Sequence, residues 1–575
     1  MKKIITLKLI IGIMILVSSC SEESLDLKPL DAISEVDVFN DVNLLQAYVD
    51  AGYASIPNNF SGNQRMGTDP LADLAYLKNN RGEGVPEYGQ NTVDALNVET
   101  ITKNAWTRNY FGIRHVNSYF SGTENSSISQ NDLDPLTGQM LFLRAYFHFD
   151  LMSYYGGIPI ITKRFKINEE NFDVPRNSIE EVVDFIVSEL DKAIPLLDEN
   201  APKARASKAA AMALKGRVLL YAASPLLNPS VDMSKWTAAA AANKAVMDLA
   251  SYPMTEDYRS IFLSRPSIAD EVIFTREYNL EVNQGTWSGA NTMYWPNGYQ
   301  GWHSVSPNQK FIDLFEMTNG ETPYLPDGVT VNPASGYDPQ NPYVNRDPRL
   351  SDIALYNGVM FKDRDVQYWI EYEDDGDGNP SDRTEVAGGL DTHLSPIYSW
   401  EPSLTNYAFR KFTDPTELPA LSGAPTEEFT PDIKFRKTEF YLNYAETQIA
   451  LGNEQAAREA INAVRARASV NMPPVTASGN DLIEAYRRER AIELSLEGHR
   501  FFDIRRWKIA GEVMGKPMYG IDVEKLSTGD IVYSYGTKIA EATELRTWDD
   551  RLYWLPIPDR EVKASNNALE QNPGY

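Results

Sequence analysis

Between about residue 41 and residue 251, hydrophobic positions recur every three or four residues, as on one face of an α-helix. Leu141, Ala145 and Met152 share one such face, and Ser178 stands before two glutamates as a helix N-cap does. Alanine, glycine and tyrosine lie where helices would pack closely. The pattern predicts successive helix pairs of the tetratricopeptide-like kind, although no regular repeat is visible.

The pattern changes from residue 252 to residue 431, where Gly, Pro, Asn and aromatic residues crowd together. Turn dipeptides such as Asn297-Gly298 and Asn357-Gly358 recur there, which predicts long loops with short strands. Helical periodicity returns at residues 434–469 and 481–507. The predicted fold class is therefore mainly α, with a helical scaffold drawn from both ends of the chain and a loop-rich middle region.

The first residues have the pattern of a secretion signal. Met1-Lys2-Lys3 is basic, Leu9 to Val17 is apolar, and small residues lead to Cys20. The apolar run is far shorter than a membrane span. One interpretation is an ordinary signal peptide that happens to end near a cysteine. The other is a lipoprotein signal, in which Cys20 is the lipidation site and its acyl chains anchor the mature protein to a membrane.

These patterns divide the chain into three predicted parts. Residues 1–19 are the signal peptide, residues 20–251 the N-terminal helical half, and residues 252–575 the C-terminal half, with a loop-rich ligand face followed by helices. Long ordered loops usually carry function, so we expect ligand contacts in the middle of the chain.

Composition excludes several classes of protein. The 575 residues include 54 Lys and Arg against 80 Asp and Glu, a formal charge of −26. So acidic a chain lacks the basic footprint that nucleic acid requires. Its single cysteine rules out an intramolecular disulfide framework and a zinc site with several cysteines.

The stretch from residue 287 to residue 302 is the strongest candidate for a ligand surface. Its aromatic residues are separated by Gly and Pro, and exposed rings of this kind can stack on the C–H faces of sugars. The candidate stacking residues are Trp287, Tyr294, Trp295, Tyr299 and Trp302. The alternative is that several of these rings fill the core beneath the loop. A weaker candidate is the loop at 62–90, with Tyr76 and Tyr88.

An acidic turn resembles a calcium-binding loop. Asp375, Asp377 and Asn379 have the D-x-D-x-N spacing of an EF-hand, and they are the candidate ligands of a structural calcium ion. Pro380 and Val386 stand where that loop needs Gly and a bidentate Glu. The alternative is a solvated acidic turn. No other cofactor is expected.

Motifs of the common enzyme classes, such as H-E-x-x-H, G-x-S-x-G and the Walker loop, are absent from the sequence. The five histidines are scattered without paired spacing. A glycosidase with two catalytic carboxylates stays open at this point, because the separation of such a pair is a three-dimensional property.

Several motifs, in order along the chain, resemble the SusD/RagB family of Bacteroidetes. They are Leu143–Leu151, Tyr155–Pro159, Phe435–Glu446, Asn462–Arg467, Glu489–Trp507, Leu555–Pro558 and Gln571–Tyr575. Within them, Arg505 and Arg506 beside Glu497 and Asp503 predict an ion network at a helix end.

The resemblance implies a helical fold with tetratricopeptide-like pairs and no catalytic activity. It also implies a surface lipoprotein that binds glycans and lies as a lid over a SusC-like TonB-dependent transporter. The alternatives are a peptide-binding member of the same family, a secreted glycoside hydrolase, and a helical scaffold that binds only proteins.

The lipid anchor can be tested directly. We expect radioactive palmitate to label the wild type and to be lost in Cys20→Ala, because the thiol is the predicted acceptor. Ser19→Ala keeps that thiol and should be labelled and membrane-associated like the wild type. Undiminished labelling of Cys20→Ala would refute the assignment.

Overall fold

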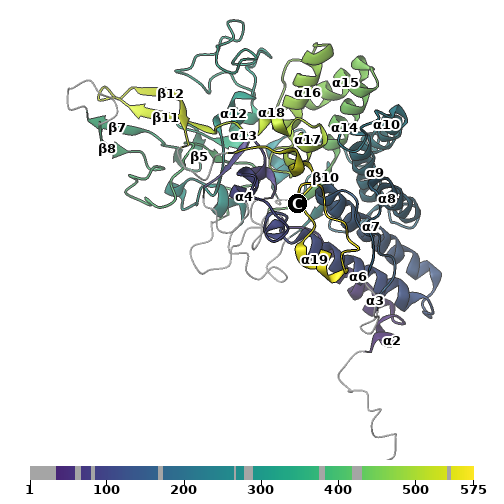
Figure 1. Ribbon diagram of the computed structural model, residues 1–575. Helices are drawn as coiled ribbons and strands as arrows, with labels where there is room; N and C mark the ends of the chain where they lie inside the picture. Colours follow the sequence, from purple (N-terminus) through teal and green to yellow (C-terminus); the bar gives the residue numbers. More distant parts are fainter. Residues whose placement is uncertain are drawn as a thin grey trace, which may run out of the picture.

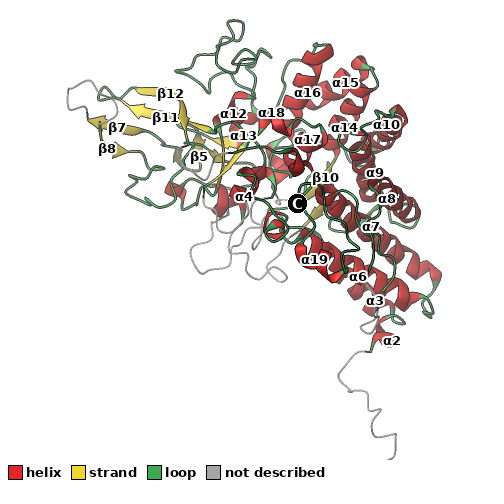
Figure 2. Cartoon of the chain, in the orientation of Figure 1, coloured by secondary structure: helices red, strands yellow, loops and turns green. Residues whose placement is uncertain are grey.

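The computed structural model describes residues 34–58, 67–78, 85–165, 173–263, 267–277, 289–373, 383–417, 430–539 and 546–575. Helices make up most of the ordered structure and the strands are short, which confirms the predicted mainly α class (Figure 2). No described helix is both long and apolar enough to cross a membrane.

Long helices form a scaffold along one side of the molecule (Figure 1). Each packs on the next, and the row passes directly from the N-terminal to the C-terminal half where α14 packs on α10. Its members are α6 (Ala105–Thr123), α7 (Gln130–Tyr155), α8 (Ile179–Ala193), α9 (Lys208–Ala223), α10 (Met233–Met247), α14 (Lys437–Ala450), α15 (Glu454–Arg465) and α16 (Gly479–Glu493). The scaffold is thus assembled from both ends of the chain, as predicted.

The other described α-helices are shorter. They are α2 (Glu35–Val38), α3 (Val42–Gly52), α4 (Val85–Gly89), α5 (Val98–Ile101), α11 (Ala290–Tyr294), α12 (Gln309–Asp313), α13 (Arg349–Ile353), α17 (Arg500–Arg506), α18 (Ala510–Val513) and α19 (Asp559–Ala564). One hydrophobic core runs through residues of both halves of the chain.

The strands lie mainly on the side away from the scaffold (Figure 1). Four of them form a sheet in the order β12-β11-β7-β8, in which β11 and β7 are parallel and the other pairs antiparallel. These are β7 (Ile370–Glu373), β8 (Thr384–Gly388), β11 (Tyr519–Lys525) and β12 (Ile531–Lys538). Two-stranded ribbons pair β1 (Ala75–Leu77) with β3 (Val305–Pro307), β2 (Val272–Arg276) with β10 (Asp432–Arg436), β4 (Ala354–Leu355) with β9 (Ala408–Phe409), and β5 (Met360–Phe361) with β6 (Arg364–Asp365).

Local sequence explains where the scaffold helices begin, end and approach one another. Ser178 caps α8 in a reciprocal capping box with Glu181. α7 ends at Tyr155 because Gly156 adopts a φ of +75°, which glycine tolerates best. Where α6 meets α7, a Cβ at Gly112 would lie 2.5 Å from the ring of Phe147, so only glycine allows this close packing.

Two predicted helix boundaries are wrong. The segment from Lys434 to Arg436 belongs to β10, which pairs with β2, and the helix begins only at Lys437. The predicted helix at 481–507 is broken into α16 and α17. At the break, the amides of Leu496 and Gly498 donate to the buried carboxylate of Asp69 at 3.0 and 3.2 Å. A contact more than 400 residues away in the sequence therefore stabilises the turn.

The C-terminal end of α7 is stabilised by a buried arginine. Arg505 has 1% of its surface exposed, and it donates to the carbonyl oxygens of Ser153, Tyr154 and Tyr553. Ser153 and Tyr154 are among the last carbonyls of α7, where the helix dipole is negative and a cation is favoured. Arg505 thus satisfies helix-end carbonyls. Of the predicted ion network, Arg506 pairs with Asp503 and also with Glu446, whereas Glu497 pairs with Arg436 and Lys411.

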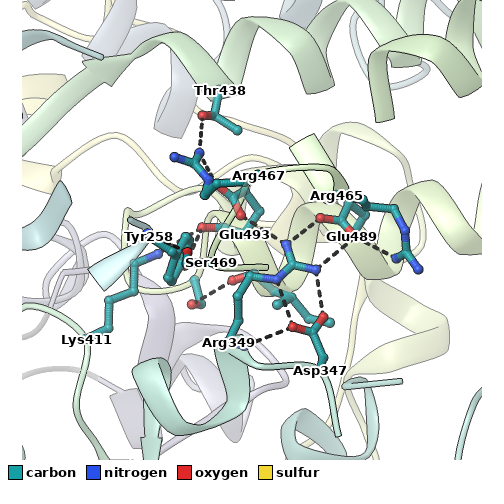
Figure 3. Close-up of polar contacts among 12 residues, drawn as sticks. Tyr258, Asp347, Arg349, Lys411, Thr438, Arg465, Arg467, Ser469, Glu489 and Glu493 are labelled. Carbon is teal, nitrogen blue, oxygen red and sulfur yellow. Dashed lines mark hydrogen bonds and ion pairs between the residues drawn. The ribbon is translucent and has the colours of Figure 1, made fainter. Parts of the chain in front are cut away.

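A buried ion network joins the loop-rich middle to the helices (Figure 3). Arg349, in α13, is completely buried and pairs with Asp347 at 2.7 Å. It also pairs with Glu489 and, at 3.0 Å, with Glu493, both of which lie on α16. Arg465, at the end of α15, reaches the same Glu489 at 3.0 Å.

The network continues through Glu493 into β10 and the segment before β2. Arg436 contacts Glu493 at 2.9 Å and Glu271 at 3.0 Å, and Arg467 contacts Glu271 at 2.8 Å. Burial alone would raise the pKa of Glu493, but Arg436, Arg467 and Arg349 outweigh it and lower the pKa to about 2. Glu493 is therefore ionised at neutral pH, with its charge shared among three arginines.

Breaking this network should cost far more than breaking a surface ion pair. We expect Arg349→Leu to lower the free energy of unfolding by about 3–5 kcal/mol in a urea titration, because it leaves buried carboxylates without a partner. Arg487→Leu is the control, since Arg487 pairs with the largely exposed Glu484. It should cost less than about 1 kcal/mol. Equal losses in both variants would contradict this account.

Candidate functional site

The candidate site is built on a compact turn between α11 and β3, which we call the central turn (residues 296–304). Its backbone folds back onto α11: the amide of Trp302 donates to Thr292 at 2.8 Å, and that of Ser304 donates to Met293 at 2.8 Å. Gly301 lies so close to the Trp295 carbonyl that a Cβ there would collide with it. The turn is therefore rigid and needs glycine at this position.

Two of the five candidate stacking rings are buried. Tyr294 and Trp295 are 1% and 0% exposed, so the expectation that they face solvent is wrong. Phe361 meets the Trp295 ring edge-on at 5.5 Å, and the Lys362 ammonium lies 3.9 Å from the centre of that ring. These rings fill the core beneath the turn. Trp287 lies outside the described residues.

Tyr299 and Trp302 are partly exposed at the central turn. The Tyr299 hydroxyl donates to the carbonyls of Phe361 and Arg364, and the Arg364 guanidinium lies 3.9 Å from the centre of its ring. One face of Tyr299 is therefore already occupied. Trp302 packs partly against the core. Ligand contact by these two rings stays a prediction.

The structure reveals an exposed aromatic residue that the sequence reasoning missed. Trp400 is 73% exposed and lies in a segment that we call the apolar loop (residues 391–404). The loop also exposes Leu394, Ile397 and Leu404. In the sequence, Trp400 was marked only by two nearby prolines, Pro396 and Pro402. This stretch has fewer aromatic residues than the stretch from residue 287 to residue 302, so it did not stand out as a ligand surface.

The apolar loop is tied to the central turn on both sides of Trp400. The Asn297 side-chain amide donates to the carbonyls of Thr392 and Tyr398 at 2.9 and 2.5 Å. On the other side of Trp400, Nδ1 of His303 lies 3.0 Å from the Glu401 carbonyl. Trp400 is thus held beside the central turn by backbone groups that flank it, while its own ring stays in solvent.

His303 supports this arrangement as a neutral imidazole. Burial, together with nearby Lys78, lowers its pKa to about 3. A neutral ring has one donor and one acceptor. With Nδ1 donating to Glu401, Nε2 accepts from the Tyr368 hydroxyl at 2.7 Å. Both ring nitrogens are therefore satisfied, and the residue links the apolar loop to the segment before β7.

The other predicted sites are not assembled by the described residues. Tyr76 and Tyr88, the aromatics of the weaker loop candidate, are each 1% exposed and belong to the core. Asp375, Asp377 and Asn379, the proposed calcium ligands, lie outside the described residues. Among the residues that are described, no cluster of three or more His, Cys, Asp or Glu side chains could hold a metal ion.

Comparison with known proteins identifies the family to which this fold belongs. The sequence profile of the SusD family matches residues 270–575, more than half of the chain. A second profile, described as "starch-binding associating with outer membrane", matches residues 25–220. The chain therefore belongs to the SusD family.

Relatives and solved structures cover nearly the whole chain. SusD-like protein P2 of Formosa agariphila is 22% identical, with 97% of each chain covered. A SusD-like protein from Bacteroides fragilis is 27% identical with a TM-score of 0.74, covering 95% of this chain and 100% of that one. A laminarin-binding SusD-like protein shares the fold at 22% identity and a TM-score of 0.60, covering 93% of this chain and 100% of that one.

The hydrogen bonds that join the apolar loop to the central turn can be tested by hydrogen exchange. We expect Asn297→Ala to accelerate amide exchange in residues 391–404 about tenfold, because it removes two hydrogen bonds that hold this loop. Ser399→Ala changes an exposed side chain of the same loop and should leave exchange unchanged. If Asn297→Ala also left it unchanged, the loop would be held by other contacts.

Proposed function

We propose that this protein is a surface-exposed lipoprotein that captures oligosaccharide and delivers it to a SusC-like TonB-dependent outer-membrane transporter. The observation that carries the binding step is Trp400, which is 73% exposed and is held beside the central turn by hydrogen bonds from Asn297 and His303 to the backbone of Tyr398 and Glu401. In this proposal the protein is a binding protein and has no catalytic activity.

An exposed aromatic ring that is held in place, such as that of Trp400, can stack on a sugar ring. Pyranose rings present C–H faces that pack on aromatic planes, and an aromatic side chain loses little conformational entropy when it is already held. Gln300, which is exposed on the central turn, supplies an amide for sugar hydroxyls. Each contact replaces hydrogen bonds to water, so we expect weak binding per site.

Known proteins of the same fold support a glycan as the ligand. The structural neighbours include the laminarin-binding protein and a surface glycan-binding protein A from Bacteroides fluxus. The profile matched by residues 25–220 is described as starch-binding. These descriptions name laminarin, glycan and starch, so they support a carbohydrate ligand. They do not indicate which sugar this chain binds.

The anchor and the transporter complete the proposal. Lipid on Cys20, followed by the polar tether Ser21-Glu22-Glu23-Ser24, would hold the body at the outer membrane. The description "associating with outer membrane" supports this location. From there, the protein would act as a lid that closes on a SusC-like barrel and passes the oligosaccharide to it.

Affinity electrophoresis through gels that contain single polysaccharides tests the binding step. We expect at least one glycan to retard the wild type and Trp400→Ala to bind it about tenfold more weakly, a loss of about 1.4 kcal/mol. Phe111→Ala is the matched control, because Phe111 is 69% exposed on α6 and lies outside the candidate site. It should bind like the wild type.

Three results would change the proposal. Equal weakening in Trp400→Ala and Phe111→Ala would place the binding surface elsewhere. A mobility shift with peptides and none with any glycan would make the protein a peptide-binding member of the family. Release of reducing sugar over time would identify it as a hydrolase.

A further inference from the structure

The central turn has no charged side chain, although the chain as a whole is strongly acidic. Residues 289–307, which include the whole central turn, contain no Asp, Glu, Lys or Arg. His303 is the one histidine there, and it is buried and neutral. A ligand that lies along the central turn therefore meets rings, amides and backbone groups, and no ionic partner from this segment.

The two carboxylates of the apolar loop are already paired with the nearest basic groups. Asp391 binds Arg364 through two hydrogen bonds of 2.7 and 2.9 Å, and Glu401 binds Lys78 at 2.9 Å. The side chains of Arg364 and Lys78 are only 19% and 11% exposed. A sulfate or uronate could reach either cation only by displacing its carboxylate, which would leave that acid unpaired.

Lys362, which lies outside the two segments, is an exposed cation whose ammonium lies over the ring of Trp295. It is followed by two exposed acids, Asp363 and Asp365, which offset its charge toward an anion. His393, on the apolar loop, is 2.7 Å from the carboxylate of Glu385. The net charge of −26 adds a long-range repulsion toward any polyanion.

We infer that the site selects uncharged glycans and rejects polyanionic ones, whether their charge is sulfate or uronate. The inference rests on the proposed function and narrows it to a substrate class. A neutral chain needs only ring faces and hydroxyl partners, which the central turn and the apolar loop provide. A polyanion would lose hydration and gain no free cation among the described residues of these two segments.

Matched pairs of polysaccharides test the inference, because the two members share a backbone and differ in charge. Suitable pairs are dextran with dextran sulfate, hydroxyethylcellulose with carboxymethylcellulose, and laminarin with its sulfated derivative. We expect at least one neutral member to retard the protein, with affinity at least about tenfold above that for its charged counterpart. This retardation should not change between about 50 and about 500 mM NaCl, since no ion pair is involved.

A gain-of-charge variant sharpens the test. Ser399→Lys adds a cation next to Trp400 on the exposed side of the apolar loop. We expect this variant to gain retention by the charged member of the pair, and high salt should abolish that gain. Ala238→Lys places the same charge at an exposed position of α10 and should gain nothing.

The possible outcomes distinguish a failure of the charge selectivity from a failure of glycan binding itself. Stronger retention of the wild type by a charged member than by its neutral partner would overturn the selectivity and leave glycan binding intact. An equal gain in Ser399→Lys and Ala238→Lys would show that overall charge, and not this site, controls selection. No retention by either member of any pair would remove both proposals.

Discussion

The completely buried guanidinium of Arg349, held by Asp347 and by two glutamates of α16, is the contact on which the loop-rich middle region depends. The described residues of this region form only short elements, so little of its shape comes from its own secondary structure. Burying these charges is costly unless every partner is in place. The network therefore favours one arrangement of loops and helices and disfavours nearby alternatives, which gives the loops a defined position although they are irregular.

The same network reaches the candidate site through Lys411. This residue follows β9, the strand that leads out of the apolar loop, and its buried ammonium donates to the Glu493 carbonyl at 2.9 Å and to Glu497 at 2.8 Å. The strand that follows the loop is thus fixed to the core, while Asn297 and His303 hold the loop itself. Trp400 can remain exposed because the backbone around it is constrained by others. A ring presented in this way loses little entropy when a ligand arrives.

The sequence allowed the fold class and most scaffold helices to be predicted, because their periodicity, caps and stops are local. The capping box at Ser178 and the glycine stop at Gly156 are examples. The site could be located only to a region. Trp295 and Trp302 stand in the same Gly- and Pro-rich stretch, and nothing in their neighbours distinguishes the buried ring from the partly exposed one. That difference depends on Phe361 and Lys362, which arrive from the β5–β6 ribbon.

By itself, the sequence determined the family, the helical scaffold and the acidic net charge, since each follows from local pattern or composition. Only the tertiary structure decided which aromatic rings face solvent, where the α16–α17 break falls and which charges remain free. Arg505 illustrates the reason: its role is to satisfy carbonyls at the end of α7, about 350 residues earlier in the chain. Burial and charge pairing are properties of contacts between distant segments, and a pattern of neighbouring residues does not contain them.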